Sequence, residues 1–295
     1  MSTIRDLGYA RYAGARRPAS TRWRVIARNT IAVSWKTWWR FKSSLGVAVI
    51  TTFVAGGLLY FASEKLGMLA RDGLRLKLAD SVLPQSIAWF CRVAFLPTLT
   101  VGAGMVAGDV ASGAFTFYFA RSLRPRDYVI GRVAGFAFLM STIIVAGPLA
   151  IALLRVGLSE STSELVDNLW VVPKALAIGG FGVMIYAAVP LGFSALVGSR
   201  RSALALWAAY YLVVGNIAFI VGMASSSPWM GALHLPSALE SIAFALFDVQ
   251  FSWGTRLAVP PIAAVVSIVA HAAVAIAIVF VQVRRAQQTG VGGSS

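Results

Sequence analysis

The chain alternates between long uncharged apolar stretches and short segments that hold its charges. Stretches without a charged residue occur at 43–63, 93–108, 133–154, 175–199, 202–239 and 257–283. A helix needs about 20 apolar residues to cross the hydrocarbon core of a bilayer, where the backbone must form its hydrogen bonds internally. The pattern therefore predicts an all-α integral membrane protein. Its six transmembrane helices are expected near 44–62, 86–108, 129–154, 174–198, 202–223 and 259–282.

The segment 21–42, directly before the first predicted span, has two opposite faces. At about 100° per residue, an α-helix over this segment would be amphipathic. One half of its surface would hold Trp23, Ile26, Thr30, Val33, Trp38 and Phe41. The other half would hold Arg24, Arg28, Lys36, Arg40 and Lys42. We expect an N-terminal amphipathic interfacial helix, either as an elbow that braces a partner or as a simple membrane anchor.

A short apolar helix is predicted at 238–247, before the last span. Ser237 followed by Glu240 fits a capping box, and Pro236 precedes both residues. A helix of this length is too short to cross the bilayer, so we expect it to lie in the outer leaflet or dip back into it. Glu240 is assigned to capping its own helix rather than to binding a substrate.

The remaining segments are expected to connect these helices or to be flexible. The loop at 63–86 carries no recognisable motif, and the acidic loop at 155–173 is predicted to be a solvated connection. Residues 1–20 are predicted to form a flexible basic lead, and residues 284–295 a flexible tail. With no internal repeat, 1–295 is predicted to be a single transmembrane domain, with its six-span bundle at 43–283.

Composition and charge support the membrane assignment and give it a direction. Hydrophobic residues make up 58% of the 295 positions and charged residues only 13%, too few for the surface of a soluble domain. The segments 1–42, 108–132, 200–201 and 284–285 hold ten, four, two and two of the 26 Lys and Arg residues, but only three of the 11 acids. Six spans place these segments on one side of the membrane. The positive-inside rule makes that side cytoplasmic, together with both termini. This asymmetry accounts for the net charge of +15 without nucleic acid as a partner.

No residue pattern indicates an active site, a metal site or a nucleotide site. The sequence contains no HExxH metal-binding pattern, no GxxxxGK[ST] phosphate loop and no GxSxG nucleophile elbow. His234 is expected on a loop surface and His271 within a span, packed against its neighbours. Neither has a second ligand at metal-binding spacing. Cys91 is the only cysteine in the sequence, so no internal disulfide is possible. We expect no cofactor in this chain, and any ATP-driven work must use a separate subunit.

Polar groups within the predicted spans are few, and each has two interpretations. Arg92 is placed near the outer edge of the second span, where it either snorkels to the headgroups or faces a substrate path beside Trp89. Asn216 either ties two helices together or lines a cavity. The GxxxG patterns Gly104–Gly108 and Gly131–Gly135 are expected to pack helices within one chain rather than across a dimer.

Charges interrupt the apolar pattern between the second and third spans, in GDVASGAFTFYFARSLRPRDYVIGRVAG at 108–135. The part ASGAFTFYFARS has the length of a short helix on the cytoplasmic side. It would expose four aromatic side chains, Phe115, Phe117, Tyr118 and Phe119. Exposed aromatic side chains in this place indicate a protein partner or burial among lipid headgroups.

This segment resembles the region between the second and third spans in the permease subunits of type-2 ABC exporters. The family pattern is an acid at the end of the second span, Gly-Thr, an apolar helix, a short Arg/Pro turn, and a return of the form YxxGK. The positions that match it are Asp109, Gly113, Tyr128, Gly131 and, in place of the final lysine, Arg132. The positions that depart from it are Ala114, Ser122 and Pro125.

The resemblance implies that 111–122 is a coupling helix that sits in a cleft of a separate ATPase. The residues assigned to ATPase coupling are Asp109, Gly113, Phe115, Phe117, Tyr118, Phe119, Arg121, Arg124, Asp127 and Arg132. The resemblance also implies two ATPase copies that hold ATP and Mg²⁺, a second permease copy or paralogue, and a location in the bacterial cytoplasmic (inner) membrane. Because spans two and five line the path in the family, Trp89, Arg92 and Asn216 are assigned to the substrate path.

Three classes of function fit these features to different degrees. The leading hypothesis is a permease of an ATP-driven exporter, and the sparse intramembrane charge favours an amphiphile over an ion as its substrate. The second is a membrane scaffold or regulator that uses the same cytoplasmic helix to recruit a partner without transport. The third is an intramembrane enzyme, which the absence of clustered acids, histidines or an activated serine disfavours.

Overall fold

The computed structural model describes residues 19–36, 41–64, 72–119, 123–249 and 259–292, and these residues form helices and turns with no strand. Six helices in the described part are long and apolar enough to cross a membrane, which confirms the predicted number of spans. They cover Ser43–Phe61, Ser81–Ala111, Pro125–Gly157, Thr162–Leu196, Arg200–Ala224 and Pro261–Gln288. The chain therefore has the architecture of a multi-pass helical membrane protein.

The spans are built from α-helices, with a π-helical segment in the second span (η3) and another in the fifth (η4). Up to the third span the elements are η1 (Ala19–Thr21), α1 (Arg22–Lys36), α2 (Ser43–Glu64), α4 (Asp72–Pro97), η3 (Thr98–Gly102), α5 (Met105–Ala111), α6 (Ala114–Phe119), α7 (Pro125–Ile144) and α8 (Ala146–Gly157). They are followed by α9 (Thr162–Leu169), α10 (Val171–Leu196), α11 (Arg200–Ala209), η4 (Tyr210–Val214), α12 (Gly215–Ala224), α13 (Pro228–Gly231), α14 (Leu235–Phe247) and α15 (Pro261–Gly292).

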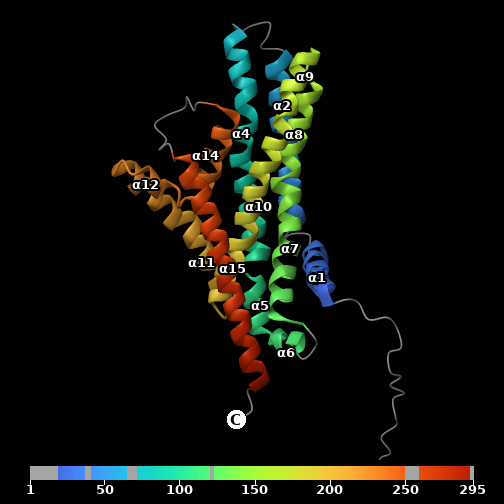
Figure 1. The fold of residues 1–295 in the computed structure, drawn as a ribbon, viewed down its shortest axis with the longest axis vertical. Coiled ribbons are helices and arrows are strands. Elements are labelled where there is room, and N and C mark those ends of the chain that lie inside the picture. Colours follow the sequence, from blue (N-terminus) through green and yellow to red (C-terminus); the bar gives the residue numbers. More distant parts are fainter. Residues whose placement is uncertain (1–18, 37–40, 65–71, 120–122, 250–258, 293–295) are drawn as a thin grey trace, which may run out of the picture.

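The molecule is an elongated bundle with two distinct ends (Figure 1). The short helix α6 lies at one end together with the C-terminal end of α15, and α9 lies at the opposite end. We refer to these as the α6 end and the α9 end. Helix α1 runs beside α7 in the half of the bundle nearer the α6 end. This arrangement places α1 and the C-terminal end of α15 in the same half of the bundle, as an even number of crossings requires.

The second span is interrupted near the α6 end, and a neighbouring span compensates for the interruption. After the π-helical segment η3, the chain turns at Ala103 and Gly104 before α5 begins. The backbone N–H groups of Val106 and Ala107 donate to Ser194 Oγ of α10, at 3.0 and 2.9 Å. Donors freed by a broken helix must find partners inside a membrane protein, because lipid supplies none. Ser194 therefore stabilises the interruption.

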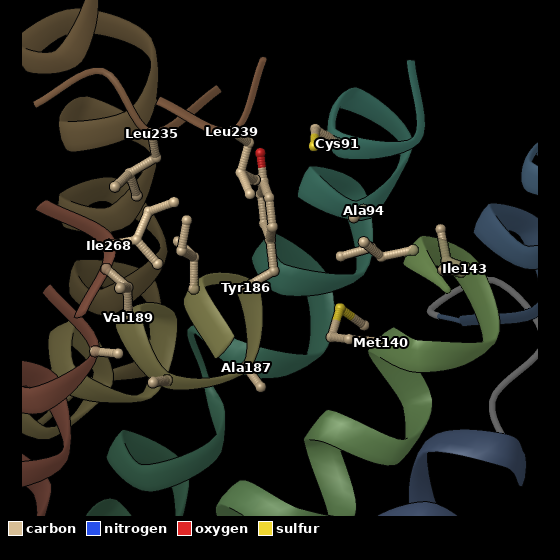
Figure 2. Packing of buried hydrophobic residues seen from close by; sticks show 14 of the residues in the cluster. Cys91, Ala94, Met140, Ile143, Tyr186, Ala187, Val189, Leu235, Leu239 and Ile268 are labelled. Atoms are coloured by element: carbon tan, nitrogen blue, oxygen red, sulfur yellow. The ribbon is translucent and has the colours of Figure 1, made fainter. Parts of the chain in front are cut away.

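Helix α10 lies at the centre of the hydrophobic core and packs against α7, α8, α14 and α15. Figure 2 shows Tyr186 and Ala187 of α10 between Cys91 and Met140 on one side and Leu235 and Ile268 on the other. Glycines allow the close approaches: a Cβ on Gly192 would lie 2.7 Å from the Cβ of Ala275. Small residues at helix contacts are typical of membrane bundles, in which packing rather than the hydrophobic effect holds helices together.

Several helices extend beyond the predicted boundaries. Helix α9 forms inside the loop expected to be a solvated connection, because Ser161 caps it by accepting a hydrogen bond from the Glu164 backbone N–H at 3.2 Å. Helix α4 begins at Asp72, within the predicted loop 63–86. Helix α15 continues to Gly292, into the segment 284–295 that was predicted to be a flexible tail. The first 18 residues of the predicted lead lie outside the described part.

The short apolar helix before the last span is present as α14, but it begins three residues earlier than predicted. Its N-cap is His234, so Ser237 lies in the first turn and is not the cap. Ser267 Oγ of α15 donates to the Ala232 carbonyl at 2.6 Å, and Tyr210 Oη of η4 donates to the Leu233 carbonyl at 3.2 Å. The turn before α14 is thus fastened to the fifth and sixth spans.

Helix α1 uses its small-residue face for a close contact with α7, and this face differs in part from the predicted apolar one. Ile26, Ala27 and Thr30 are buried, whereas Val33, assigned to the apolar half, is 56% exposed. A Cβ on Gly131 would lie 2.5 Å from the Ile26 Cβ. The expectation that Gly131–Gly135 packs helices within one chain is confirmed, and α1 is a brace on the third span.

Replacing Gly135 with Leu is expected to push α1 away from α7. A Cβ there would lie 2.8 Å from the Ala27 carbonyl oxygen and 2.9 Å from the Thr30 Cβ. Overpacking of this kind costs about 1–3 kcal/mol. Hydrogen exchange over 22–36 should accelerate and the unfolding temperature should fall. Gly180→Leu in α10 is the control, because nothing lies within 4 Å of its Cβ position. Equal behaviour of the two variants would contradict the close contact.

His234 is half-buried rather than on a loop surface, which corrects the sequence prediction. Its ring lies 5.7 Å from that of Phe219, and its Nδ1 is 2.7 Å from Ser237 Oγ. Burial lowers the pKa of the His234 imidazole from 6.5 to about 4. The folded chain therefore holds this histidine neutral over most of the physiological pH range.

Acidification from pH 7 to pH 4.5 is expected to destabilise this region through His234. Its folded pKa is depressed, so its contribution is complete above pH 6.5 and is lost as the pH falls towards 4, by up to about 3 kcal/mol. Thermal unfolding in detergent should show a larger pH-dependent loss for the natural chain than for His234→Gln, which keeps a hydrogen-bonding group beside Ser237. The same pH dependence in both proteins would refute this assignment.

Candidate functional site

A buried ion pair joins the second and third spans at the α6 end. Asp109, near the end of α5, pairs with Arg132 in the second turn of α7, and their side chains are only 14% and 8% exposed. Tyr128 Oη donates to Asp109 Oδ2 at 2.5 Å, one turn before Arg132 on the same helix. The Arg132 guanidinium also lies 5.4 Å from the centre of the Tyr128 ring. Asp109 and Arg132 were assigned to the site from the 108–135 segment, whereas Tyr128 was only matched to the family pattern; the structure brings the three together.

The same cluster includes Thr30 of α1, which the sequence reasoning did not assign to the site. Arg132 Nη1 donates to Thr30 Oγ1 at 3.2 Å. Thr30 is 1% exposed, and it is a polar residue on the half of α1 that was predicted to be apolar. A polar residue on an apolar helix face is the signal that would have marked it. The cluster therefore ties three helices, α1, α5 and α7, at one point.

The energetics of this cluster depend on all of its members being present. Arg132 Nε is buried and has no hydrogen-bond partner among the described residues, so the guanidinium relies on Asp109 and Thr30. Removing one partner of a buried ion pair costs about 3–5 kcal/mol, because the other charge stays buried without compensation. The pair is thus a rigid junction at the α6 end of the bundle rather than an exposed surface contact.

The short helix α6 is fixed to this junction through aromatic packing. Gly113 begins the segment with a φ of +64°, a conformation that favours glycine, and α6 follows directly. The Phe115 ring lies edge-on to Tyr128 at 5.1 Å and stacks on Phe119 at 5.7 Å. The Tyr118 ring is 5.7 Å from Tyr128, and burial raises the pKa of the Tyr118 hydroxyl, which stays protonated. Tyr128 therefore links the ion pair to α6.

The prediction that four aromatic side chains of this segment are exposed was wrong for Phe115. It is 6% exposed, because Tyr128 on the returning helix covers it. Tyr118 and Phe119 are half-buried, and only Phe117, at 76% exposed, projects freely from α6. A helix this short presents one face to its own protein and the other to its surroundings. Phe117 is thus the aromatic side chain available to a partner.

The other residues assigned to this segment have separate positions. The Asp127 carboxylate accepts a hydrogen bond from the Arg124 backbone N–H at 3.2 Å, so it caps α7 and is 7% exposed. The side chain of Arg124 is exposed. Arg121 lies outside the described residues. Asp127 is therefore a structural residue, whereas Arg124 remains available at the surface.

The side chain of Arg200, from the fifth span, packs against Gly104 and Gly108 of the second span. A Cβ on Gly108 would lie 2.4 Å from Arg200 Nε, and one on Gly104 would lie 3.5 Å from Arg200 Cγ. Arg200 begins α11, after the short turn between the fourth and fifth spans. The Gly104–Gly108 pair therefore packs within the chain, as expected, but it holds a side chain rather than a helix. Sequence reasoning placed Arg200 only in a basic turn.

The residues assigned to a substrate path do not belong to this junction. Arg92 lies over the Trp89 ring at 4.6 Å, and both side chains are exposed on the surface of α4. Asn216 Nδ2 donates to the Leu212 carbonyl of its own fifth span at 2.9 Å. The prediction that Asn216 ties two helices is not supported, because its hydrogen bond is local. An apolar groove of about 250 Å³ between α10 and α15 contains none of the three.

The described residues include no group of three or more His, Cys, Asp or Glu side chains placed so that they could hold a metal ion. His271 is engaged instead by Tyr210, with 2.6 Å between its Nε2 and the Tyr210 hydroxyl. Comparison with protein-family models finds none that matches the chain, and comparison with curated protein sequences finds no match. The features of the chain that bear on its function are therefore the six spans, the buried Asp109–Arg132 pair and the exposed face of α6.

Proposed function

We propose that the chain is the membrane-spanning permease of an ATP-driven exporter of the type-2 ABC kind, driven by a separate ATPase subunit. The observation that carries this proposal is that α6 is fixed to the buried Asp109–Arg132 ion pair on one side and exposes an aromatic side chain, Phe117, on the other. Asp109, Tyr128 and Arg132 fix α6 to the second and third spans, while Phe117 projects from it. A helix built in this way can transmit a force from a soluble partner to the spans.

The mechanism follows from this rigidity. Phe117 enters an apolar pocket on the ATPase, and Arg124 meets acids at the rim of that pocket. When two ATPases close around ATP and Mg²⁺, they move α6, and the buried ion pair obliges the second and third spans to move with it. Two permease copies then alternate between inward-open and outward-open states around a path between them. The chain itself supplies no nucleotide site.

Orientation and substrate class follow from charge. The α6 end carries the exposed Arg124 and Arg126 and is the cytoplasmic end by the positive-inside rule. The resemblance to type-2 ABC exporter permeases supports a bacterial inner membrane as the location. Both termini are cytoplasmic in this arrangement. Charged groups are scarce within the spans, so an amphiphile rather than an ion is the transported molecule. Arg92 and Trp89, exposed on the second span of a single chain, would face this path or lipid.

Copurification tests the proposal against its runner-up, a scaffold that recruits a partner without transport. A tagged permease, expressed from its natural host in mild detergent, should retain one ATPase copy per permease copy. Mass spectrometry should find a phosphate loop in that partner, and its ATP hydrolysis should be sensitive to vanadate. Recovery of the permease with a soluble partner that lacks a phosphate loop would favour the scaffold.

A further inference from the structure

The last helix, α15, continues well past the length needed to cross the membrane. The stretch from Pro261 to Val283 is about 34 Å long at 1.5 Å per residue, which already exceeds a hydrocarbon core of about 30 Å. The first charges after this apolar stretch are Arg284 and Arg285, which mark its boundary. The remaining turns, from Arg284 to Gly292, extend the helix by about 13 Å beyond that boundary.

This extension is packed against the protein on one side. Val283 is completely buried, and Ala286 is partly buried against the hydrophobic core. Helices α6 and α15 are in contact, and Figure 1 shows α6 beside the lower turns of α15. The α6 helix therefore contacts the helix whose last turns continue past Arg284 and Arg285. Phe117 of α6 is 76% exposed beside this contact.

The outer faces of α6 and of the α15 extension share one type of charge. Arg124 and Arg126 beside α6 are exposed, as are Arg284 and Arg285 on α15. Among the described residues of these segments, the nearby acids Asp109 and Asp127 are mostly covered and are engaged by Arg132 and by the α7 N-terminus. The surface is thus one exposed phenylalanine accompanied by arginines, with no competing exposed carboxylate on 112–119, 123–127 or 283–288.

We infer that the extension of α15 and the helix α6 form one composite docking surface for the ATPase. This inference rests on the proposed function, and it adds a second contact that the sequence expectation treated as a flexible tail. The complementary face on the partner has an apolar pocket for Phe117 and acidic side chains that reach both Arg124 and Arg284. Because α15 also packs along α10 and α14, the partner gains a direct connection to the sixth span as well as to the second and third.

Site-specific photocrosslinking tests the composite surface in the intact chain. The photoreactive residue p-benzoylphenylalanine is introduced in separate variants at Gln288, at Phe117 and, as a control, at Ile262. Gln288 is exposed on the extension, whereas Ile262 is 75% exposed at the opposite end of the same helix. We expect positions 288 and 117 to crosslink to the same phosphate-loop ATPase, identified by mass spectrometry, and position 262 to give no such product.

The outcomes separate the two levels of the proposal. A crosslink to the ATPase from position 117 but only to lipid, or to nothing, from position 288 would overturn the composite surface and leave the proposed function intact. No ATPase crosslink from either position would contradict both. As a second readout, Arg284→Glu should lower the amount of copurified ATPase about tenfold, whereas Arg201→Glu, an exposed arginine on a different turn, should leave it within about twofold. Equal effects of the two reversals would also count against the inference.

Discussion

Replacing Asp109 with Asn is expected to detach α6 from the bundle while the six spans remain folded. The variant removes the charge that compensates Arg132, whose Nε already has no partner in the part of the chain that the structure describes. A buried charge left in this state costs about 3–5 kcal/mol. The chain can reduce that cost by opening the junction and exposing the guanidinium to water. Hydrogen exchange over 112–119 should therefore accelerate strongly, and the amount of copurified ATPase should fall more than tenfold.

The control for this prediction is the double variant Asp109→Asn with Arg132→Gln. It leaves no uncompensated charge, so at least half of the lost stability should return, although the tie to α6 is weaker than in the natural chain. Helices that do not contact α6, such as α9 and α14, should exchange at the same rate in all three proteins. If Asp109→Asn were as stable as the natural chain, with α6 unchanged in exchange, the ion pair would not be the junction described here.

Replacing Phe117 with Ala is expected to weaken ATPase binding at least tenfold without loss of stability. The side chain is 76% exposed in the isolated chain, and surface substitutions of this kind change the free energy of unfolding by about 0.5 kcal/mol or less. An aromatic anchor that fills a partner pocket contributes about 2 kcal/mol or more to binding, and 1.4 kcal/mol is tenfold in affinity. Binding of the purified partner to immobilised permease measures the first effect, and thermal unfolding measures the second.

Phe115→Ala is the matched variant, two residues away on the same helix. Phe115 is 6% exposed and packs on Tyr128 and Phe119, so its truncation should cost about 3 kcal/mol of local stability. The two variants should therefore differ. Phe117→Ala should lose ATPase binding with normal stability, whereas Phe115→Ala should lose stability. Normal ATPase binding by Phe117→Ala would remove this side chain from the proposed contact, and equal destabilisation by both would contradict the assigned faces of α6.

The number of spans could be predicted from the sequence because the property that defines a span is local. Uncharged runs such as 133–154 are long enough to cross a bilayer, and nothing elsewhere in the chain changes that requirement. The helical continuation of α15 to Gly292 was missed for a related reason. Arg284 and Arg285 mark the membrane boundary by charge, but a boundary of the membrane is not a boundary of the helix.

The contacts of the candidate site were only partly predictable because they join distant parts of the chain. Asp109 and Arg132 could be proposed together from one short segment, but the hydrogen bond from Tyr128 of the same segment was not predicted. Thr30 is 102 positions from Arg132, and no local pattern connects the two. The burial of Phe115 likewise depends on how the chain returns after the turn, which places Tyr128 over its ring. Patterns identify which residues form helices, but tertiary packing decides which face of a short helix is free.

The most direct measurement of the central claim is a cryo-EM structure of the purified complex in a lipid nanodisc. We expect a soluble ATPase subunit beneath each permease copy, with α6 seated in its cleft and the Phe117 ring inserted in an apolar pocket. The Asp109–Arg132 pair should remain closed in that complex. A complex in which α6 lies against the lipid headgroups, with Phe117 in contact with acyl chains and the soluble partner bound elsewhere, would contradict the account.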